Sequence, residues 1–383
     1  MGRRLAILVF LCLTLLMGLV FPDVWDRALS RKDELPPGIT APEKRLLRVW
    51  LIEDTLSASS WLKRQAARFE DAQKGISVYI RTARTQELTS PDTILPDMIL
   101  FRPGTVKNPE GLFLPLTGDY PLSDGAQRAG RWQGMQYAMP VCMDGYVLAF
   151  DPALTGAVAA TPAPTPLLGI GASPANTPSP EKSSSFEDLV SSLSLVPRSK
   201  NAVCDFQCAS GMPLMLFSAL SGGMARFPPG ALPSNFGSVT QDAAYSEFLS
   251  GRSRAAMLSS RQLRGLAAQS KPFALIAPPL PVTDMYLAAG IVKGGGSDMA
   301  LQYLMQLLSR EGQQDLAQGG IMAVSREVSP YGADPVFSQV EGSLRGDLIL
   351  PNAFAYDEQG LKSVSKSVFT NGGAISDIFE SIR

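Results

Sequence analysis

The amino-terminal half of the folded chain alternates short apolar runs with one helical pattern. Strands are expected at residues 46–52, 76–80 and 96–101. The apolar side of a helix between the first two strands is marked by residues at helical spacing, Trp61, Leu62, Ala66 and Phe69. Ser59 or Ser60 is placed to cap its start. This order predicts an α/β fold with mostly parallel sheets and helices on both faces.

A second continuous pattern runs from residue 273 to residue 328. Two apolar runs, residues 273–277 and 285–292, are separated by prolines and are typical of buried strands. The second run ends in Lys293-Gly-Gly-Gly-Ser297, where Ser297 is expected to cap a helix. The apolar positions of that helix are Ala300, Tyr303, Leu304, Leu307 and Leu308. The glycines could bind an anion through backbone N–H groups, but a flexible helix-entry turn is the favoured interpretation.

The chain begins with a targeting segment. Arg3 and Arg4 precede an apolar run at residues 5–21, which is close to the lower limit of about 17–25 residues for a spanning helix. No small residues mark a cleavage site, so an uncleaved membrane anchor is favoured over a signal peptide. Residues 22–45 are rich in proline and are expected to be a linker. The predicted location is extracytoplasmic and membrane-associated, on the extracellular face or in the periplasm.

Charge and composition exclude several function classes. Lys and Arg number 34 against 35 Asp and Glu, so no global field attracts nucleic acid. The chain has no histidine, which removes Ser-His-Asp catalysis and histidine metal sites. Cys204 and Cys208 could form a disulfide in an oxidising compartment or remain buried thiols. We therefore expect no metal, no cofactor and no nucleic-acid partner.

Two passages carry a family resemblance. Residues 273–324 read as apolar strand, Ala-Pro-Pro-Leu-Pro, glycine-flanked strand, Lys-Gly-Gly-Gly-Ser, helix and Gly-Gly-Ile-Met-Ala-Val. Residues 132–152 contain Gly134-Met-Gln-Tyr-Ala-Met-Pro140 and then Phe150-Asp151, which stands where a Tyr-Asn pair is usual. This order resembles extracytoplasmic solute-binding proteins of ABC importers, the maltose- and oligosaccharide-binding type. In that family these passages cross between two lobes.

The resemblance implies a two-lobed periplasmic-binding-protein-like fold of type II, with a hinge between the lobes. The first lobe is expected to combine residues 46–139 with 288–322, and the second to combine residues 140–287 with 323–383. Residues 156–185 are rich in Ala, Pro, Thr and Ser and are expected to be a mobile insertion in the second lobe. Gly169-Ile-Gly171 within it lacks the flanking strand and helix of a nucleotide fingerprint and is interpreted as loop.

Candidate ligand-binding residues follow the ends of the expected strands, where ligands bind in α/β sheets. They are Glu53, Asp54, Arg102, Asp144, Arg261, Phe354 and Tyr356. The two aromatic residues follow a Pro-Asn segment like the one that leads into ligand contacts in the family, although either can also be a core residue. Each charged residue can also be a solvated loop charge. Ser260-Arg261-Gln262 replaces the family's Gly-Pro-Trp, so a ring that commonly holds a sugar face is missing.

The implied function is binding without catalysis. The protein is expected to capture a small polar solute, a carbohydrate or polyol, between its lobes and deliver it to the membrane permease subunits of an ABC importer. Arg102 and Arg261 leave an anionic ligand open, because guanidinium groups match carboxylate and phosphate geometry. One alternative is an enzyme, for which Glu53 and Asp144 are the only carboxylate pair that could face across the cleft. Another is a degenerate membrane-anchored sensor or envelope scaffold without a transport role.

Overall fold

The computed structural model divides the chain into two units, Met1–Arg45 and Leu46–Arg383. It describes residues 44–90, 93–118, 120–151, 204–205, 226–227, 236–237, 241–269, 272–276, 283–294, 296–325, 327–329, 331, 334, 337, 341 and 350–374. The apolar run at residues 5–21, the linker, the insertion at residues 156–185 and Cys208 lie outside these residues. No helix in the described part of the chain is both long and apolar enough to cross a membrane.

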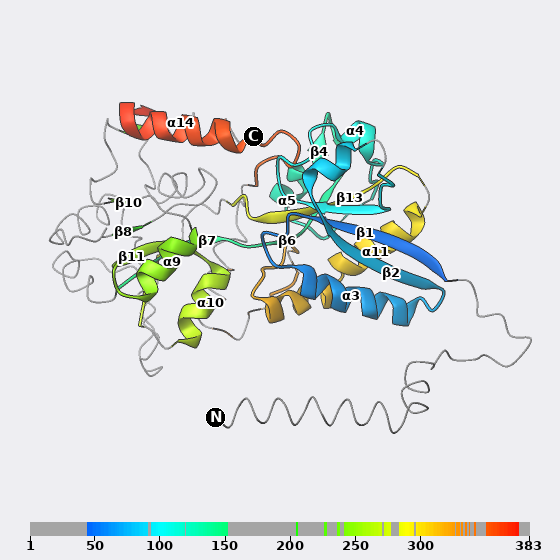
Figure 1. The fold of residues 1–383 in the computed structure, drawn as a ribbon, viewed down its shortest axis with the longest axis horizontal. Helices are drawn as coiled ribbons and strands as arrows, with labels where there is room; N and C mark the ends of the chain where they lie inside the picture. The colour runs from blue at the N-terminus through cyan, green and yellow to red at the C-terminus, as the bar shows by residue number, and fades with distance from the viewer. Residues whose placement is uncertain are drawn as a thin grey trace, which may run out of the picture. The chain divides into compact units, whose positions relative to one another are not determined.

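The first sheet has five strands in the order β2-β1-β3-β13-β6 (Figure 1). Their bounds are β1 Arg45–Ile52, β2 Ile76–Ala83, β3 Met98–Phe101, β6 Met139–Met143 and β13 Tyr286–Ile291. β1 and β3 are parallel, whereas β13 is antiparallel to both of its neighbours, β3 and β6. β1, β3 and β6 therefore run in one direction, and β13 runs against them.

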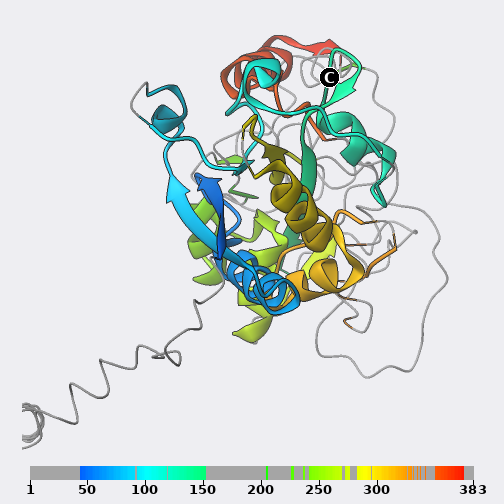
Figure 2. The ribbon, with the colours of Figure 1, turned by 90° about the vertical axis from the view of Figure 1, so that its right-hand side faces the viewer.

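Helices α3 (Ser59–Ala72) and α11 (Ser297–Leu308) lie side by side against this sheet, as Figures 1 and 2 show. The predicted apolar stripe of α3 is buried: Trp61, Leu62, Ala66 and Phe69. Shorter elements accompany the first sheet, namely η1 (Thr85–Thr89), α4 (Pro109–Leu112), α5 (Asp124–Ala129), the β4 (Arg131–Trp132) and β5 (Met135–Gln136) hairpin, α12 (Arg310–Gln314) and η3 (Asp315–Gly319).

Both predicted helix caps are wrong in detail. α3 has no side-chain cap from Ser59 or Ser60; the Asp54 carboxylate instead accepts the N–H groups of Ala58 at 2.8 Å and Ser59 at 3.1 Å. Ser297 is the first helical residue of α11 and not its cap. The cap is Gly296, whose φ of 85° is a left-handed conformation that glycine adopts without strain.

The second sheet also has five strands, in the order β10-β8-β11-β7-β12. Their bounds are β7 Tyr146–Phe150, β8 Cys204–Asp205, β10 Phe236–Gly237, β11 Ala255–Ser259 and β12 Ala274–Ile276. β7 is the reversed strand here, since it is antiparallel to β11 and β12 while β8 is parallel to β10 and β11. α9 (Gln241–Leu249) and α10 (Ser260–Ala268) both pack on β11. Towards the carboxyl end, α14 (Glu358–Asn371) leads to β14 (Gly373–Ala374), which pairs with β9 (Arg226–Phe227).

Chain segments that join the two sheets meet at one place. The chain leaves β6 of the first sheet and enters β7 of the second through Asp144 and Gly145 alone. The Asp144 N–H donates to the Met285 carbonyl just before β13, at 2.7 Å, and Met143 exchanges backbone hydrogen bonds with Met322. The predicted lobe boundaries at 139/140 and 287/288 lie inside β6 and β13. An uninterrupted apolar run in the sequence does not reveal at which residue the strand ends and the chain passes to the other sheet.

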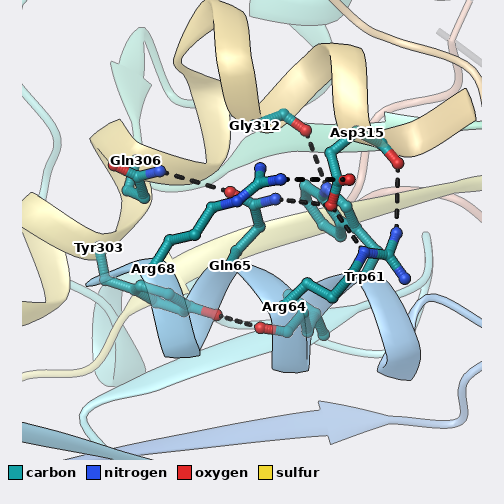
Figure 3. A network of polar contacts seen from close by, with 9 residues as sticks. Trp61, Arg64, Gln65, Arg68, Tyr303, Gln306, Gly312 and Asp315 are labelled. Atoms are coloured by element: carbon teal, nitrogen blue, oxygen red, sulfur yellow. Dashed lines mark hydrogen bonds and ion pairs between the residues drawn. The ribbon is translucent and has the colours of Figure 1, made fainter. Parts of the chain in front are cut away.

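A polar network ties α3 to the segment after α11 (Figure 3). The Asp315 carboxylate is buried and accepts hydrogen bonds from Arg64 Nε and Gln65 Nε2, both at 2.9 Å. Arg68 adds an ion pair at 3.6 Å, and Trp61 Nε1 donates to the Gly312 carbonyl at 2.9 Å. Because the donors are on α3 and the acceptors lie in α12 and η3, the network holds α3 against the helices that follow α11.

We expect Asp315→Ala to lower the free energy of unfolding by about 2–3 kcal/mol. The substitution leaves the buried Gln65 amide without its acceptor and removes two charge-assisted contacts. Asp71→Ala is the control, because Asp71 is 82% exposed and pairs only with an exposed lysine, and such pairs contribute little. Chemical denaturation of both variants tests this; equal stabilities would contradict it.

Candidate functional site

Two hollows flank the loop that follows β1. The first hollow, of about 390 Å³, is lined chiefly by polar residues: Glu53, Thr85, Arg102, Thr105, Lys107, Tyr356, Asp357, Glu358 and Gln359, with Pro103 and Gly104. The second hollow, of about 450 Å³, is lined by Thr55, Leu56, Asp144, Tyr245, Ser259, Arg261, Gln262, Gly265 and Met285. Glu53 faces one hollow and Thr55 and Leu56 face the other, so this short loop separates them.

The loop between β1 and α3 has an unusual backbone. Glu53 has a φ of 49° and Ser57 a φ of 55°, a left-handed region that is uncommon for residues other than glycine. The Asp54 carboxylate holds this conformation, since both of its oxygens accept backbone N–H groups at the start of α3. Thr85 Oγ1 donates to Glu53 Oε1 at 2.7 Å and fixes the other side of the loop. Strained backbone of this kind is concentrated at functional sites.

Polar groups that line the first hollow are held by ion pairs and hydrogen bonds within the protein. Arg102 forms an ion pair with Glu358, and Lys107 Nζ donates to the Tyr356 carbonyl at 2.6 Å. The Tyr356 hydroxyl donates to Asp284 Oδ2 at 2.8 Å, and its ring is buried. These contacts connect the end of β3 with the start of α14 and join the segment before α14 to the segment before β13. The polar groups around the first hollow therefore hold separate parts of the chain together.

Asp144 is buried at the crossing between the sheets. Its Oδ1 accepts the N–H of Gly145 at 2.7 Å and of Ser260 at 3.0 Å, and its Oδ2 accepts the N–H of Arg261 at 3.5 Å. Burial raises the pKa of this carboxyl above its ordinary value, although these hydrogen bonds act in the opposite direction. The expectation that Asp144 is an open cleft charge is therefore wrong: its carboxylate holds the start of α10.

The groups that line the second hollow belong to a loop that follows a strand of the first sheet and to helices that pack on the second. Thr55 and Leu56 belong to the loop after β1, whereas Tyr245 is on α9 and Arg261 is on α10. The exposed Arg261 guanidinium donates to Ser57 Oγ, which joins α10 to the loop after β1. Hydroxyl, amide and guanidinium groups thus surround a hollow with Leu56 and Met285 as its apolar lining.

The structure divides the seven predicted site residues among four environments. Asp144 and Arg261 line the second hollow, and Glu53, Arg102 and Tyr356 line the first. Asp54 lines neither hollow and acts at the start of α3. Phe354 corrects the prediction most clearly, because its ring is 1% exposed and lies in a cluster with Phe101, Phe113 and Trp132. Its place is in the core, where it offers no surface to a ligand.

Tyr245, Thr55 and Met285 also line the second hollow and were not predicted from the sequence. Tyr245 follows the buried Ala244 on a helix whose next buried position is Phe248, so the helical pattern places it at the edge of the apolar face. Gly265 is a further sequence signal for this contact, because glycine inside a helix is unfavourable and often marks a site of close packing. In the described part of the chain, no cluster of His, Cys, Asp or Glu could hold a metal ion.

Comparison with solved structures finds proteins of the same fold. The GacH receptor of Streptomyces glaucescens, known unliganded and in complex with acarbose, has a TM-score of 0.58 at 13% identity, over 88% of this chain and 94% of that one. An ABC substrate-binding protein of Listeria monocytogenes in complex with cycloalternan has a TM-score of 0.59 at 13% identity, over 88% and 97% of the chains. No family model and no curated protein matches the sequence. The predicted periplasmic-binding-protein-like α/β fold is confirmed.

We expect Asp144→Ala to lower the free energy of unfolding by about 2–3 kcal/mol, because buried N–H groups at the crossing lose their acceptor. Chemical denaturation measures the change, with Asp71→Ala again as the exposed carboxylate control. An unchanged stability would show that the Asp144 carboxylate is not needed at the crossing.

The Asp144 carboxyl also predicts a pH dependence. The pKa of the Asp144 carboxyl is higher in the folded than in the unfolded protein, so the folded protein binds this proton more tightly. The bound proton therefore stabilises the fold fully below the unfolded pKa of about 3.9. This stabilisation is lost as the pH rises through the raised pKa of the folded protein. The stability of the wild type minus that of Asp144→Asn should therefore be greater near pH 4 than near pH 7. A difference that shrinks on acidification would contradict the raised pKa.

Proposed function

We propose that this protein is the extracytoplasmic solute-binding component of an ABC-type importer and that it captures a neutral carbohydrate in the second hollow. The observation that carries the proposal is the origin of the lining residues. Thr55 and Leu56 follow a strand of the first sheet, whereas Tyr245, Arg261 and Gln262 belong to helices on the second. A ligand held by both sets bridges the two sheets without any change in its covalent structure.

Electrostatics of the second hollow favour a neutral ligand. The N-terminus of a helix attracts anions, but at α10 this position is already filled. The Asp144 carboxylate accepts the Ser260 and Arg261 N–H groups, and Ser259 Oγ accepts the Gln262 N–H at 3.3 Å. Arg261 donates to Ser57, and Arg102 is paired with Glu358 at the other hollow. Hydroxyl-rich sugars fit the remaining donors and acceptors better than carboxylates or phosphates do.

Closure around the ligand would use the meeting point of the two sheets as its hinge. The connection through Asp144 and Gly145 lies beside Met285, and Met143 pairs with Met322. A few loop residues at such a point can absorb the dihedral changes of domain closure. The hydrogen bond from Arg261 to Ser57 joins α10 to the loop after β1. It would form when the two sheets close on a ligand and break when they open.

The ligand class and partners are also supported by the proteins that share the fold. One of them is described in complex with acarbose and another, an ABC substrate-binding protein, in complex with cycloalternan. By this analogy the bound sugar would be delivered to permease subunits at the outer face of the membrane, and the protein would act as a binding protein and not as an enzyme.

A thermal-shift screen tests the ligand class. Maltose, acarbose and cycloalternan represent neutral or sugar-like ligands, and sugar phosphates, dicarboxylates and amino acids represent charged ones. Binding to the folded state alone adds about 2.7 kcal/mol of stability at a concentration one hundred times the dissociation constant. We expect a rise in Tm with at least one saccharide and none with the anions. A response restricted to anions would contradict the neutral-ligand proposal, and no response at all would count against solute binding.

Arg261→Ala tests whether the second hollow is the binding site. We expect weaker saccharide binding by isothermal titration calorimetry with little change in the unliganded Tm, because Arg261 is exposed. Arg252→Ala is the matched control, since Arg252 is an exposed arginine that pairs with Glu247 outside the hollow. Equal affinities for the two variants would place the site elsewhere.

A further inference from the structure

Tyr245 brings both a ring and a hydroxyl to the second hollow. Its neighbours Ala244 and Phe248 on α9 are fully buried, while Tyr245 is half-buried and packs at the edge of the core. Within the described residues, the Tyr245 hydroxyl has no hydrogen-bond partner, unlike the hydroxyls of Tyr146, Tyr286, Tyr303 and Tyr356. A hydroxyl that lines a hollow and has no hydrogen-bond partner among the described residues is available to a ligand.

Gly265 of α10 makes room for this tyrosine. A Cβ atom at position 265 would lie 2.6 Å from the Tyr245 hydroxyl oxygen and 3.4 Å from the ring carbon that carries it. At the first distance a side chain at position 265 would require the Tyr245 hydroxyl to move, whereas the second distance is an ordinary van der Waals contact. Because glycine is disfavoured in a helix interior, its presence here is explained by the space that the hydroxyl occupies.

We propose that Tyr245, seated over Gly265, is the aromatic platform that selects an uncharged sugar ring in the second hollow. This inference rests on the proposed function and assigns the selectivity of that site to one pair of residues. An aromatic face packs against the C–H face of a sugar, and the phenol can donate and accept hydrogen bonds with its hydroxyls. Tyr245 thereby supplies the ring that is missing at Ser260-Arg261-Gln262, from a different element of the fold.

Two substitutions separate the ring from the hydroxyl. With maltose, acarbose and cycloalternan as probes in isothermal titration calorimetry, Tyr245→Phe should weaken binding about threefold to tenfold by removing one hydrogen bond. Tyr245→Ala should weaken it about tenfold to a hundredfold, because the stacking surface is lost as well. Tyr79→Ala is the control, since Tyr79 is 54% exposed on β2 and lines neither hollow.

Gly265→Ala tests the pairing directly. The added methyl group should displace the Tyr245 hydroxyl and weaken binding about as much as Tyr245→Phe does. In a Tyr245→Phe background the same change should have almost no effect, because the atom at 2.6 Å is gone and the ring carbon at 3.4 Å can stay. Alanine favours helix formation, so the thermal unfolding of the variant should not reveal a loss of stability.

The outcomes distinguish this inference from the proposed function. If the wild type binds none of the three probes, the proposed function fails and the inference fails with it. If the wild type binds but both Tyr245→Phe and Gly265→Ala retain its affinity within twofold, the platform is overturned while the binding function stands. An equal loss from Gly265→Ala in both backgrounds would also overturn it, because Gly265 would then act without the Tyr245 hydroxyl. The two conservative variants carry the test if Tyr245→Ala does not fold.

Discussion

The junction at Asp144 is the constraint on which the rest of this structure depends. Two residues take the chain from β6 of one sheet into the reversed strand β7 of the other. Polar backbone groups in so short a buried connection must find partners, and the Asp144 carboxylate supplies three of the acceptor contacts. Thr283 Oγ1 donates to the Asp144 carbonyl at 2.7 Å and accepts the Met285 N–H at 3.0 Å, so the return connection is held at the same point.

This junction also determines the chemistry of the neighbouring hollow. By occupying the N-terminus of α10, the Asp144 carboxylate removes the feature that would otherwise attract an anion. What remains open are neutral groups and one arginine that is hydrogen-bonded to Ser57. In the proposed function, the Asp144 carboxylate is thus a structural group whose placement makes the second hollow less favourable to an anionic ligand.

The regular elements of the fold were largely predictable, whereas the roles of the polar residues were not. Strong periodicity located β1 and α3, because burial of Trp61, Leu62 and Phe69 dominates local structure. Asp54 follows β1, where a ligand contact is expected, but its carboxylate accepts the N–H groups of Ala58 and Ser59 and so holds the loop whose backbone is left-handed at Glu53 and Ser57.

Long-range packing accounts for the other residues whose placement in the structure was not predicted from the sequence. Phe354 enters an aromatic cluster with Phe101 from β3, which no local pattern specifies. The place of Tyr245 in the hollow depends in the same way on a contact between two helices, since Gly265 of α10 leaves the space for its hydroxyl. Neither contact follows from the spacing of apolar residues along one element.

The most direct test of the whole account is a crystal structure of the protein soaked or co-crystallised with cycloalternan or acarbose. We expect sugar density in the second hollow, in contact with Thr55 from the loop after β1 and Tyr245 from α9, with the Asp144 carboxylate still bound to the start of α10. Density in the first hollow, beside Arg102 and Glu358, would contradict it.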